Sequence, residues 1–248
     1  MAIRASMHQV GGVLLERLLA EDPGYRGPSV NCGKGHQAGF VDYRRKGLVT
    51  VVSCVHLQRA YYHCVSCARG VIPRDSELDI VSTSFSPGVR RLMARVGGKE
   101  PFDEGRLDLQ ELAGILVKTK QVERVSEAIG AQIEQVAGRE RRAALAGKVV
   151  LLHSVPKMYV AIDGTGVPMV PRETQGRAGK DETGQAKTRE AKLGCVFTQT
   201  RLDHKGRPVR DEGSTTYVGA IENANDFGWR IFTEAIRRSS RRAEQIIV

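Results

Sequence analysis

Four residues able to bind a metal ion constrain the fold of this chain more than any other feature of its sequence. Cys64 and Cys67 are separated by two residues, a spacing at which the turn between them points both sulfurs toward one ion. Upstream, Cys32 and His36 offer a sulfur and an imidazole nitrogen. Together the four side chains could form a closed tetrahedral Zn²⁺ site, which is structural because no coordination position stays open for a substrate. The sequence therefore predicts a small β unit stabilised by zinc.

The choice of ligands has alternatives. Cys54, His56 or His63 could each replace one member of the set. Cys54 falls in a β-rich run, where a buried apolar cysteine is the commoner interpretation, and a residue such as His63 is more often on the surface. The four residues could also be free of metal, but paired cysteines have few other uses in a reducing compartment.

The sequence contains neither a membrane-spanning segment nor a secretory signal, and this bears on the compartment of the protein. No apolar stretch approaches the ~20 residues that span a bilayer, and the first twenty residues have no continuous apolar core of a secretory signal. We therefore expect a cytoplasmic protein without a membrane partner. Lys and Arg number 38 against 28 Asp and Glu, a net charge of +10 that favours nucleic acid as a partner over a merely basic surface.

Apolar periodicity divides the chain into parts of different kinds, which predicts an α+β protein. The run 48–57 is β-rich, two amphipathic helical patterns flank a short joint at 117–119 as in a helix-turn-helix, and 156–248 alternates strand-like runs with a helix at 226–238. The expected parts are an N-terminal helix (1–27), a zinc-ribbon-like β unit (28–85), a helical DNA-binding region (86–150) and an α/β part (156–248).

One carboxylate follows an apolar strand pattern in the last part. The run from Tyr159 to Ile162 predicts a buried strand, and Asp163 comes directly after it, followed by Gly164. A strand delivers the side chain at its end to a fixed point on the sheet edge, where two or three carboxylates could hold Mg²⁺ ions. Asp is also a common turn residue, and a single carboxylate cannot hold two metal ions.

Several longer segments together resemble a known family. They are Gly35-His36-Gln37-Ala38, Arg59-Ala60-Tyr61-Tyr62-His63-Cys64, Ile162-Asp163-Gly164-Thr165-Gly166-Val167-Pro168, Arg189-Glu190-Ala191-Lys192-Leu193-Gly194 and Tyr217-Val218-Gly219. In this order they resemble bacterial insertion-sequence transposases of the Kra type, which carry a DDE active site. The resemblance covers most of the chain, from about residue 30 onward.

The resemblance implies an incomplete RNase-H-like catalytic domain at 156–248, with Asp163 as the first acidic Mg²⁺ ligand. In such enzymes the second Asp follows the fourth strand and the Glu lies far downstream on a helix. The sequence reaches Val248 where that second Asp would be due, and no residue here can be assigned to it. We therefore expect an N-terminal fragment unable to catalyse DNA cleavage and strand transfer alone.

The resemblance also implies double-stranded DNA, transposon ends and target, as the partner. We expect base contacts at the start of the second helix of the pair and phosphate contacts from a basic run in the β unit. The residues concerned are Lys118, Lys120, Gln121 and Arg124 in the helix, and Arg44, Arg45 and Lys46 in the β unit. The helix could instead be a packing element with a solvated basic side.

Three other functions remain open from the sequence. The chain could be a non-catalytic DNA-binding remnant or a repressor of transposition, which would need the front of the chain but not Asp163. It could be a zinc-binding interaction module unrelated to DNA, or a nuclease of the same fold, which would need the same carboxylates. The sequence also leaves open whether the chain forms a homo-oligomer.

Overall fold

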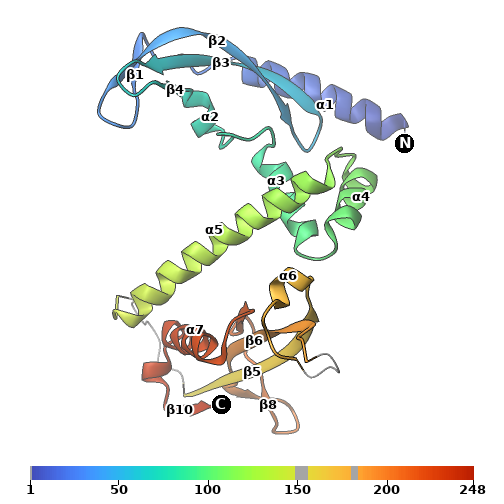
Figure 1. Cartoon of the computed structure of the whole chain (residues 1–248), viewed down its shortest axis with the longest axis vertical. Helices are drawn as coiled ribbons and strands as arrows, with labels where there is room; N and C mark the ends of the chain where they lie inside the picture. Colours follow the sequence, from blue (N-terminus) through green and yellow to red (C-terminus); the bar gives the residue numbers. More distant parts are fainter. Residues whose placement is uncertain (1, 149–155, 180–183) are drawn as a thin grey trace. The chain divides into compact units, whose positions relative to one another are not determined.

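The computed structural model describes residues 2–148, 156–179 and 184–248. The chain forms two compact units, Met1–Ile133 and Glu134–Val248, and each unit is described by itself. The long helix α5 (Thr119–Leu145) contributes to both (Figure 1). The chain is a mixed α+β protein, as the sequence predicted. The predicted end of the helical region at residue 150 lies outside the described residues.

The first unit combines an N-terminal helix, a four-stranded sheet and a group of helices. Its elements are α1 (Ala2–Ala20), β1 (Ser29–Asn31), β2 (Gln37–Val49), β3 (Cys54–Cys64), β4 (Arg69–Val71), α2 (Pro73–Glu77), α3 (Pro87–Gly97), α4 (Phe102–Ala113) and the first part of α5.

The sheet of the first unit is an antiparallel meander in which β1 to β4 lie side by side in chain order. The long strands β2 and β3 pair as far as Val49 and Cys54. The β-rich run 48–57 is therefore interrupted by a hairpin turn. Thr50 builds this turn, because its hydroxyl accepts a hydrogen bond from the backbone N–H of Ser53 and donates one to the carbonyl of Ser53.

Two small apolar clusters stabilise the sheet at its two ends. The cluster beside the cysteine-bearing turns contains Ala38, Ala60, Tyr62 and Cys64. The cluster at the other end contains Leu48, Val55, Leu57 and Ile80, against which Leu15 and Leu19 of α1 pack. Neither cluster is large, so this part of the chain has little apolar core of its own.

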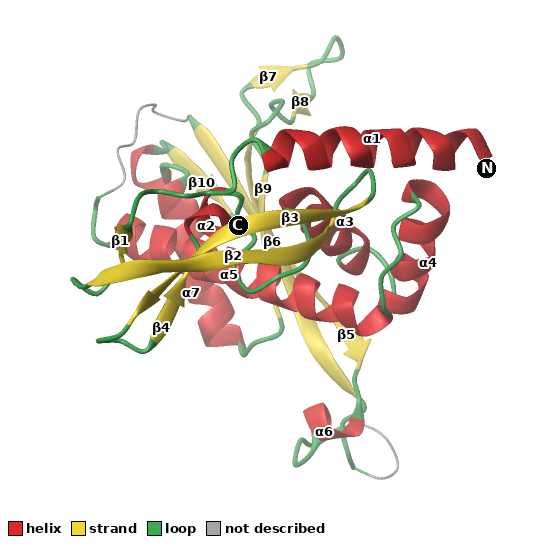
Figure 2. Ribbon diagram, turned by 90° about the horizontal axis from the view of Figure 1, so that it is seen from above, coloured by secondary structure: helices red, strands yellow, loops and turns green. Residues whose placement is uncertain are grey.

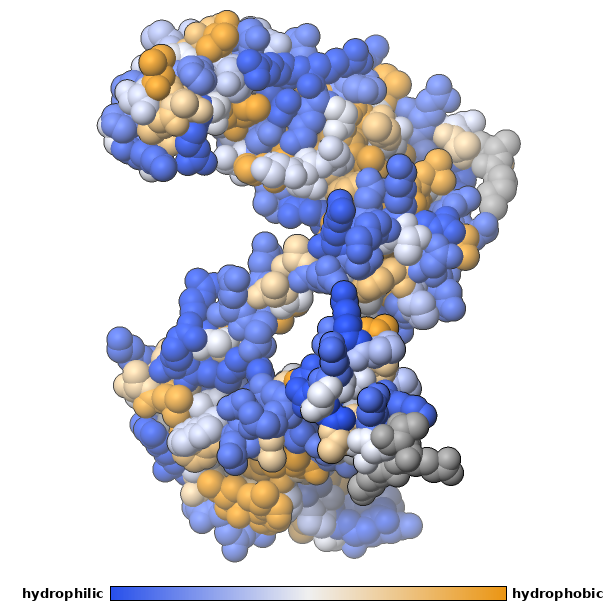
Figure 3. Space-filling view, in the orientation of Figure 1, coloured by the Kyte–Doolittle hydropathy of each residue, from blue (hydrophilic) through white to orange (hydrophobic). Residues whose placement is uncertain are grey.

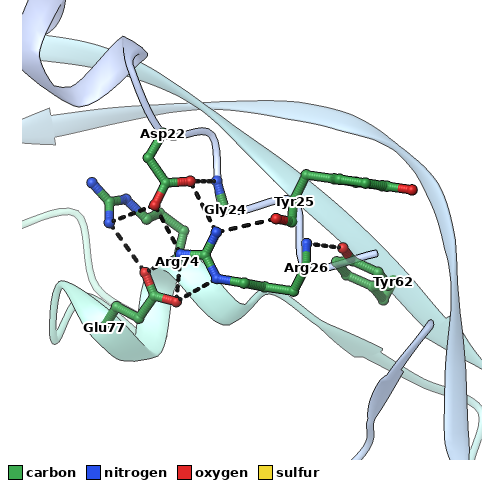
Figure 4. A network of polar contacts seen from close by, with 7 residues as sticks. All are labelled: Asp22, Gly24, Tyr25, Arg26, Tyr62, Arg74 and Glu77. Carbon is green, nitrogen blue, oxygen red and sulfur yellow. Dashed lines mark hydrogen bonds and ion pairs between the residues drawn. The ribbon is translucent and has the colours of Figure 1, made fainter. Parts of the chain in front are cut away.

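A network of ion pairs, which we call the arginine clasp, joins Asp22, Arg26, Arg74 and Glu77 (Figure 4). Arg26 donates to Asp22 at 2.8 Å and to Glu77 at 2.8 Å, and its backbone N–H donates to the hydroxyl of Tyr62 at 2.7 Å. The hydrogen bond from Arg26 holds the pKa of the Asp22 carboxyl well below its usual range. The clasp ties the segment after α1 to α2 and β3.

The helices α3, α4 and the start of α5 pack around one apolar cluster. Its buried members are Val89, Met93, Leu109, Ile115 and Val122. Helix α4 ends because Gly114 adopts a left-handed conformation, with φ of 68°, which glycine accepts without a steric cost. Leu112 near the end of α4 and Leu116 beyond the turn are exposed, whereas Ile115 between them is buried.

The second unit is a four-stranded sheet with one long helix against it, together with the end of α5. Its elements are β5 (Lys157–Pro168), α6 (Pro171–Thr174), β6 (Thr188–Thr198), β7 (Arg201–Leu202), β8 (Pro208–Val209), β9 (Thr216–Ala220), α7 (Ala224–Arg237), the 3₁₀ helix η1 (Ser240–Arg242) and β10 (Gln245–Ile247). The hairpin β7–β8 projects from the sheet (Figure 2).

The order of strands in this sheet is β10-β5-β6-β9. The first three strands in the chain, β5, β6 and β9, pair antiparallel to one another. The fourth, β10, follows α7 and lies parallel to β5 on its free side. Ile231 and Ala235 of α7 pack on Met158, Val160 and Val196, so α7 covers one face of the sheet.

Strand β5 is longer than the sequence predicted. It continues beyond Ile162 to Pro168, where Pro168 pairs with Thr188 of β6. Asp163 therefore lies inside the strand and not at its end. The same pairing extends β6 back to Thr188.

Candidate metal centre and the predicted DNA-contacting residues

Cys32 and His36 lie in the tight turn between β1 and β2. The backbone N–H of Cys32 donates to the carbonyl of His36 at 2.9 Å, which closes the turn. Gly33 and Gly35 have φ of 79° and 83°, a left-handed conformation that favours glycine. The two glycines therefore let a short turn direct the sulfur and the imidazole to the same side.

Cys64 and Cys67 lie in the turn between β3 and β4, where Cys64 is the last residue of β3. The two cysteine-bearing turns meet because β2 and β3 are antiparallel, with Gly39 near the start of β2 opposite His63 near the end of β3. The start of β2 and the end of β3 thus share one end of the sheet. The pairing of the strands brings together two ligand pairs that are far apart in the sequence.

The four ligand atoms form one compact group, within 4.8 Å of one another. The sulfurs of Cys32 and Cys67 are 3.8 Å apart, and Nδ1 of His36 is 3.1 Å from the Cys67 sulfur and 4.0 Å from the Cys32 sulfur. A tetrahedral zinc with Zn–S bonds of about 2.3 Å would separate two sulfurs by about 3.8 Å. The group could hold a metal ion, and its three sulfurs and one nitrogen suit zinc.

The pKa values of the thiols reflect this crowding. Burial raises the pKa of Cys32, but hydrogen bonds from the backbone N–H groups of Lys34 and His36 and from the neighbouring thiols outweigh burial and lower it to about 6. Burial and the adjacent sulfurs of Cys64 and Cys32 raise the pKa of Cys67 to about 11. Crowded sulfurs resist sharing several negative charges, and a divalent cation relieves that repulsion.

The alternative ligands are not members of this group. His63 adjoins Cys64, but its Nδ1 lies 3.4 Å from the hydroxyl of Tyr61. Cys54 begins β3, at the opposite end of the strand from Cys64, and it is exposed rather than buried as the sequence had suggested. The backbone N–H of His56 and its ring both contact Glu16 of α1. Within the described part of the chain, the only group of three or more Cys, His, Asp or Glu side chains placed to share an ion is the predicted set.

Most of the residues predicted to contact bases are exposed at the start of α5. Lys118, Lys120 and Arg124 are exposed, whereas Gln121 is half-buried. The side-chain carbonyl of Gln121 accepts from the backbone N–H of Lys118 at 2.8 Å, so it caps the helix. In the space-filling view, hydrophilic side chains cover much of the visible face of each unit (Figure 3).

The side chains of the basic run in β2, Arg44 to Lys46, do not all face solvent. Arg44 and Arg45 are exposed, and the Arg44 guanidinium lies 3.3 Å from the centre of the Tyr61 ring. Lys46 turns inward, where its ammonium donates to Asp75 at 3.2 Å and to the carbonyl of Ile80 at 2.6 Å. The ammonium of Lys46 therefore makes contacts inside the unit and is not placed to contact phosphate.

The partner of Lys46 belongs to a buried cluster that sequence reasoning missed. Both carboxylate oxygens of Asp75 accept from Arg59, at 2.9 and 2.7 Å, and both side chains are at most 10% exposed. The sequence contained one indication of this burial. Arg59 follows Val55 and Leu57 at intervals of two residues, which places all three side chains on the buried face of β3. The cluster joins β2, β3 and α2 and gives no opening to a ligand.

Asp163 belongs to no cluster of three or more metal-binding side chains among the described residues. It is exposed on β5, pairs with Leu193 of β6, and its carboxylate accepts from the backbone N–H of Gly164 at 2.8 Å. One carboxylate in this setting does not make a magnesium site, so the described residues do not fit Mg²⁺.

Comparison with known proteins adds no family. The sequence matches none of the models of known protein families, and no curated protein matches it. Among the helices that the structure describes, none is long and apolar enough to cross a membrane.

Proposed function

We propose that this chain binds double-stranded DNA as part of a DDE transposase, and that its second unit is the beginning of an RNase-H-like catalytic domain. In this proposal the zinc-supported sheet and the helices α3 to α5 hold the transposon end. The second unit contributes Asp163 to a carboxylate set that the described residues do not complete.

One observation carries the catalytic part of this proposal, the position of β10 beside β5. In a DDE enzyme one carboxylate comes from the first strand and another follows the fourth, so the two can meet only if those strands are neighbours. Here β10, the fourth strand, runs parallel to β5, the first, with Ile247 opposite Tyr159. The two strands therefore run in the same direction, toward Asp163, which lies four residues beyond Tyr159 on β5.

The DNA-binding part rests on the helices of the first unit. Helix α4, the turn at Gly114 and helix α5 follow one another as in a helix-turn-helix, and α3 completes their apolar core. In that motif the second helix presents its first residues to the major groove. Lys118, Lys120 and Arg124 are exposed at that position, and the net charge of +10 favours a polyanionic partner.

A second candidate, DNA binding without cleavage, is favoured because no cluster of three or more metal-binding side chains among the described residues includes Asp163. A repressor or competitor derived from a transposase would use the first unit and leave Asp163 without a role. The two candidates differ in one measurement, nicking of duplex DNA in the presence of Mg²⁺. We expect this chain to bind without nicking; nicking that Asp163→Asn abolishes would instead show that 1–248 contains a working catalytic set.

DNA binding itself is tested by its dependence on salt. Fluorescence anisotropy with a labelled duplex should give a logarithm of the binding constant that falls linearly with the logarithm of salt concentration. Combining Lys118→Ala, Lys120→Ala and Arg124→Ala should weaken binding and reduce that slope by up to about three.

The matched control removes the same charges elsewhere on the surface. Lys99, Arg172 and Lys205 are exposed and lie outside α5, and changing all three to Ala should leave most of the affinity and slope. Equal losses in the two triple variants would show that only overall charge matters. A flat response to salt in the unmodified protein would refute the DNA proposal.

A further inference from the structure

Helix α1 presents a row of apolar side chains to solvent. Ile3, Met7, Val10, Leu14 and Leu18 are 83, 66, 57, 56 and 64% exposed. They follow one another at intervals of three or four residues, the spacing that places side chains along one face of a helix. We call this row the α1 stripe.

The opposite face of α1 is fixed to the sheet, so the stripe cannot turn inward. Leu15 and Leu19 pack against the cluster at the hairpin end of the sheet. Glu16 accepts a hydrogen bond from the backbone N–H of His56 at 2.6 Å. A Cβ at Gly12 would lie 2.7 Å from Ser53, so the helix touches the hairpin turn there. The same rotation of α1 that makes these contacts keeps the stripe outside.

Two further apolar side chains beside α1 are exposed. Leu112 and Leu116 are 76 and 73% exposed. They lie near the first half of the helix, since Arg4 donates to the carbonyl of Leu112 and Leu116 borders the same hollow as Ala5 and His8. The five side chains of the stripe alone present roughly 500–600 Å² of mostly apolar surface at these exposures, the upper range of what a monomer leaves uncovered. With its rim, such a patch approaches the ~800 Å² per partner of a stable interface.

The chemistry of the stripe indicates which kind of molecule could cover it. The stripe itself has no charged member, so it offers nothing to a polyanion such as DNA. A helix that lies on a membrane surface carries a basic polar face opposite its apolar one, whereas the opposite face of α1 is packed on the sheet through Leu15 and Leu19. Of these three kinds of partner, an apolar helix face of matching length fits the stripe best.

The stripe complements a second copy of itself when the two helices run antiparallel. Ile3 then faces Leu18 of the other copy, Met7 faces Leu14, and Val10 faces Val10 across the two-fold axis. Antiparallel helices also align their dipoles favourably. The exposed Glu21 beyond the end of each helix comes to the N-terminal, positive end of the helix dipole of the other copy. We propose that two copies of this chain associate through the α1 stripe as an antiparallel, two-fold symmetric pair.

Sedimentation equilibrium of the full chain, without nucleic acid, tests the association independently of the proposed function. The unmodified protein should be dimeric, and the double variant Met7→Glu/Leu14→Glu should raise the dimer dissociation constant by about a hundredfold or more, because each carboxylate would be buried without a partner. The matched control is Leu202→Glu/Val209→Glu on the exposed β7–β8 hairpin, which should stay dimeric. Circular dichroism and zinc content check that the variants fold.

Cross-linking tests the orientation. In an antiparallel pair Val10→Cys should form a disulfide-linked dimer, whereas Leu18→Cys, which faces Ile3, should not; the unmodified protein measures any background from exposed Cys54. Cross-linking of Leu18→Cys but not Val10→Cys would overturn the antiparallel pair. A monomeric unmodified protein would overturn the dimer, and if that monomer bound phosphatidylglycerol vesicles through Met7 and Leu14, the stripe would be a membrane contact instead.

Discussion

Removing one metal ligand without leaving a cavity isolates the contribution of the metal to the first unit. Cys32 is only half-buried, so Cys32→Ser changes a ligand and little of the packing. Structural zinc sites bind with about 10–16 kcal/mol, which is comparable to the whole free energy of unfolding of a domain, about 5–15 kcal/mol. The cluster beside the site is small, with Ala38, Ala60, Tyr62 and Cys64 as its buried members. Loss of metal should therefore unfold this end of the sheet.

The structure also predicts where the unfolding stops. The helices α3 to α5 have their own apolar cluster, which contains none of the four ligands. Hydrogen exchange followed by mass spectrometry should show lost protection in β1, β4 and the adjoining ends of β2 and β3, while the helices keep theirs. The free energy of unfolding of the metal-dependent region should fall by several kcal/mol.

The control for this experiment is Cys54→Ser. It makes the same chemical change in the same sheet, at the end of β3 that lies far from the metal ligands. It should leave both the zinc stoichiometry and the exchange pattern unchanged. A purified protein without zinc, or one whose exchange pattern survives Cys32→Ser and chelation, would refute the metal centre.

Two further predictions concern the polar contacts of the first unit. Asp75→Ala should destabilise the protein by about 3–5 kcal/mol in denaturant titration, because it leaves Arg59 and Lys46 buried without their carboxylate; a loss below 1 kcal/mol would mean that water reaches these cations. The arginine clasp should weaken in acid: hydrogen bonds from Arg26 lower the pKa of Asp22, and those from Arg26 and Arg74 outweigh burial and lower that of Glu77. The stabilisation is therefore present above the ordinary carboxyl pKa of about 4 and is lost as pH falls through the lowered values, so Asp22→Asn/Glu77→Gln should flatten the acid limb of a stability–pH curve.

Local patterns in the sequence were sufficient for the elements that depend on near neighbours. The N-terminal helix, the strand over 159–162 and the helix at 226–238 correspond to elements of the structure, because helical and strand periodicity are properties of a short segment. Boundaries were less accurate. Strand β5 runs on to Pro168 because β6 pairs with it along that length, which no short segment reveals.

The candidate metal centre was predictable for a similar reason. Closely spaced Cys and His residues in a turn already point toward a common centre, and only the meeting of the two pairs required the antiparallel register of β2 and β3. The inward orientation of the Lys46 side chain was not predictable from the sequence. A basic run on an outer strand has the same sequence whether its last member faces phosphate or Asp75, and only the packing of α2 against β3 decides.

The sequence by itself predicted the favoured ligand set, most of the main helices and strands, and the excess of positive charge, since these depend on residue type and spacing along the chain. Tertiary structure decided that Asp163 lies inside a strand, outside any cluster of three or more metal-binding side chains in the described part of the chain. It also decided that β10 lies beside β5 and that α1 turns an apolar row outward. Those facts depend on which distant segments pair or pack, and strand pairing and packing add free energy only once the partners have met in space.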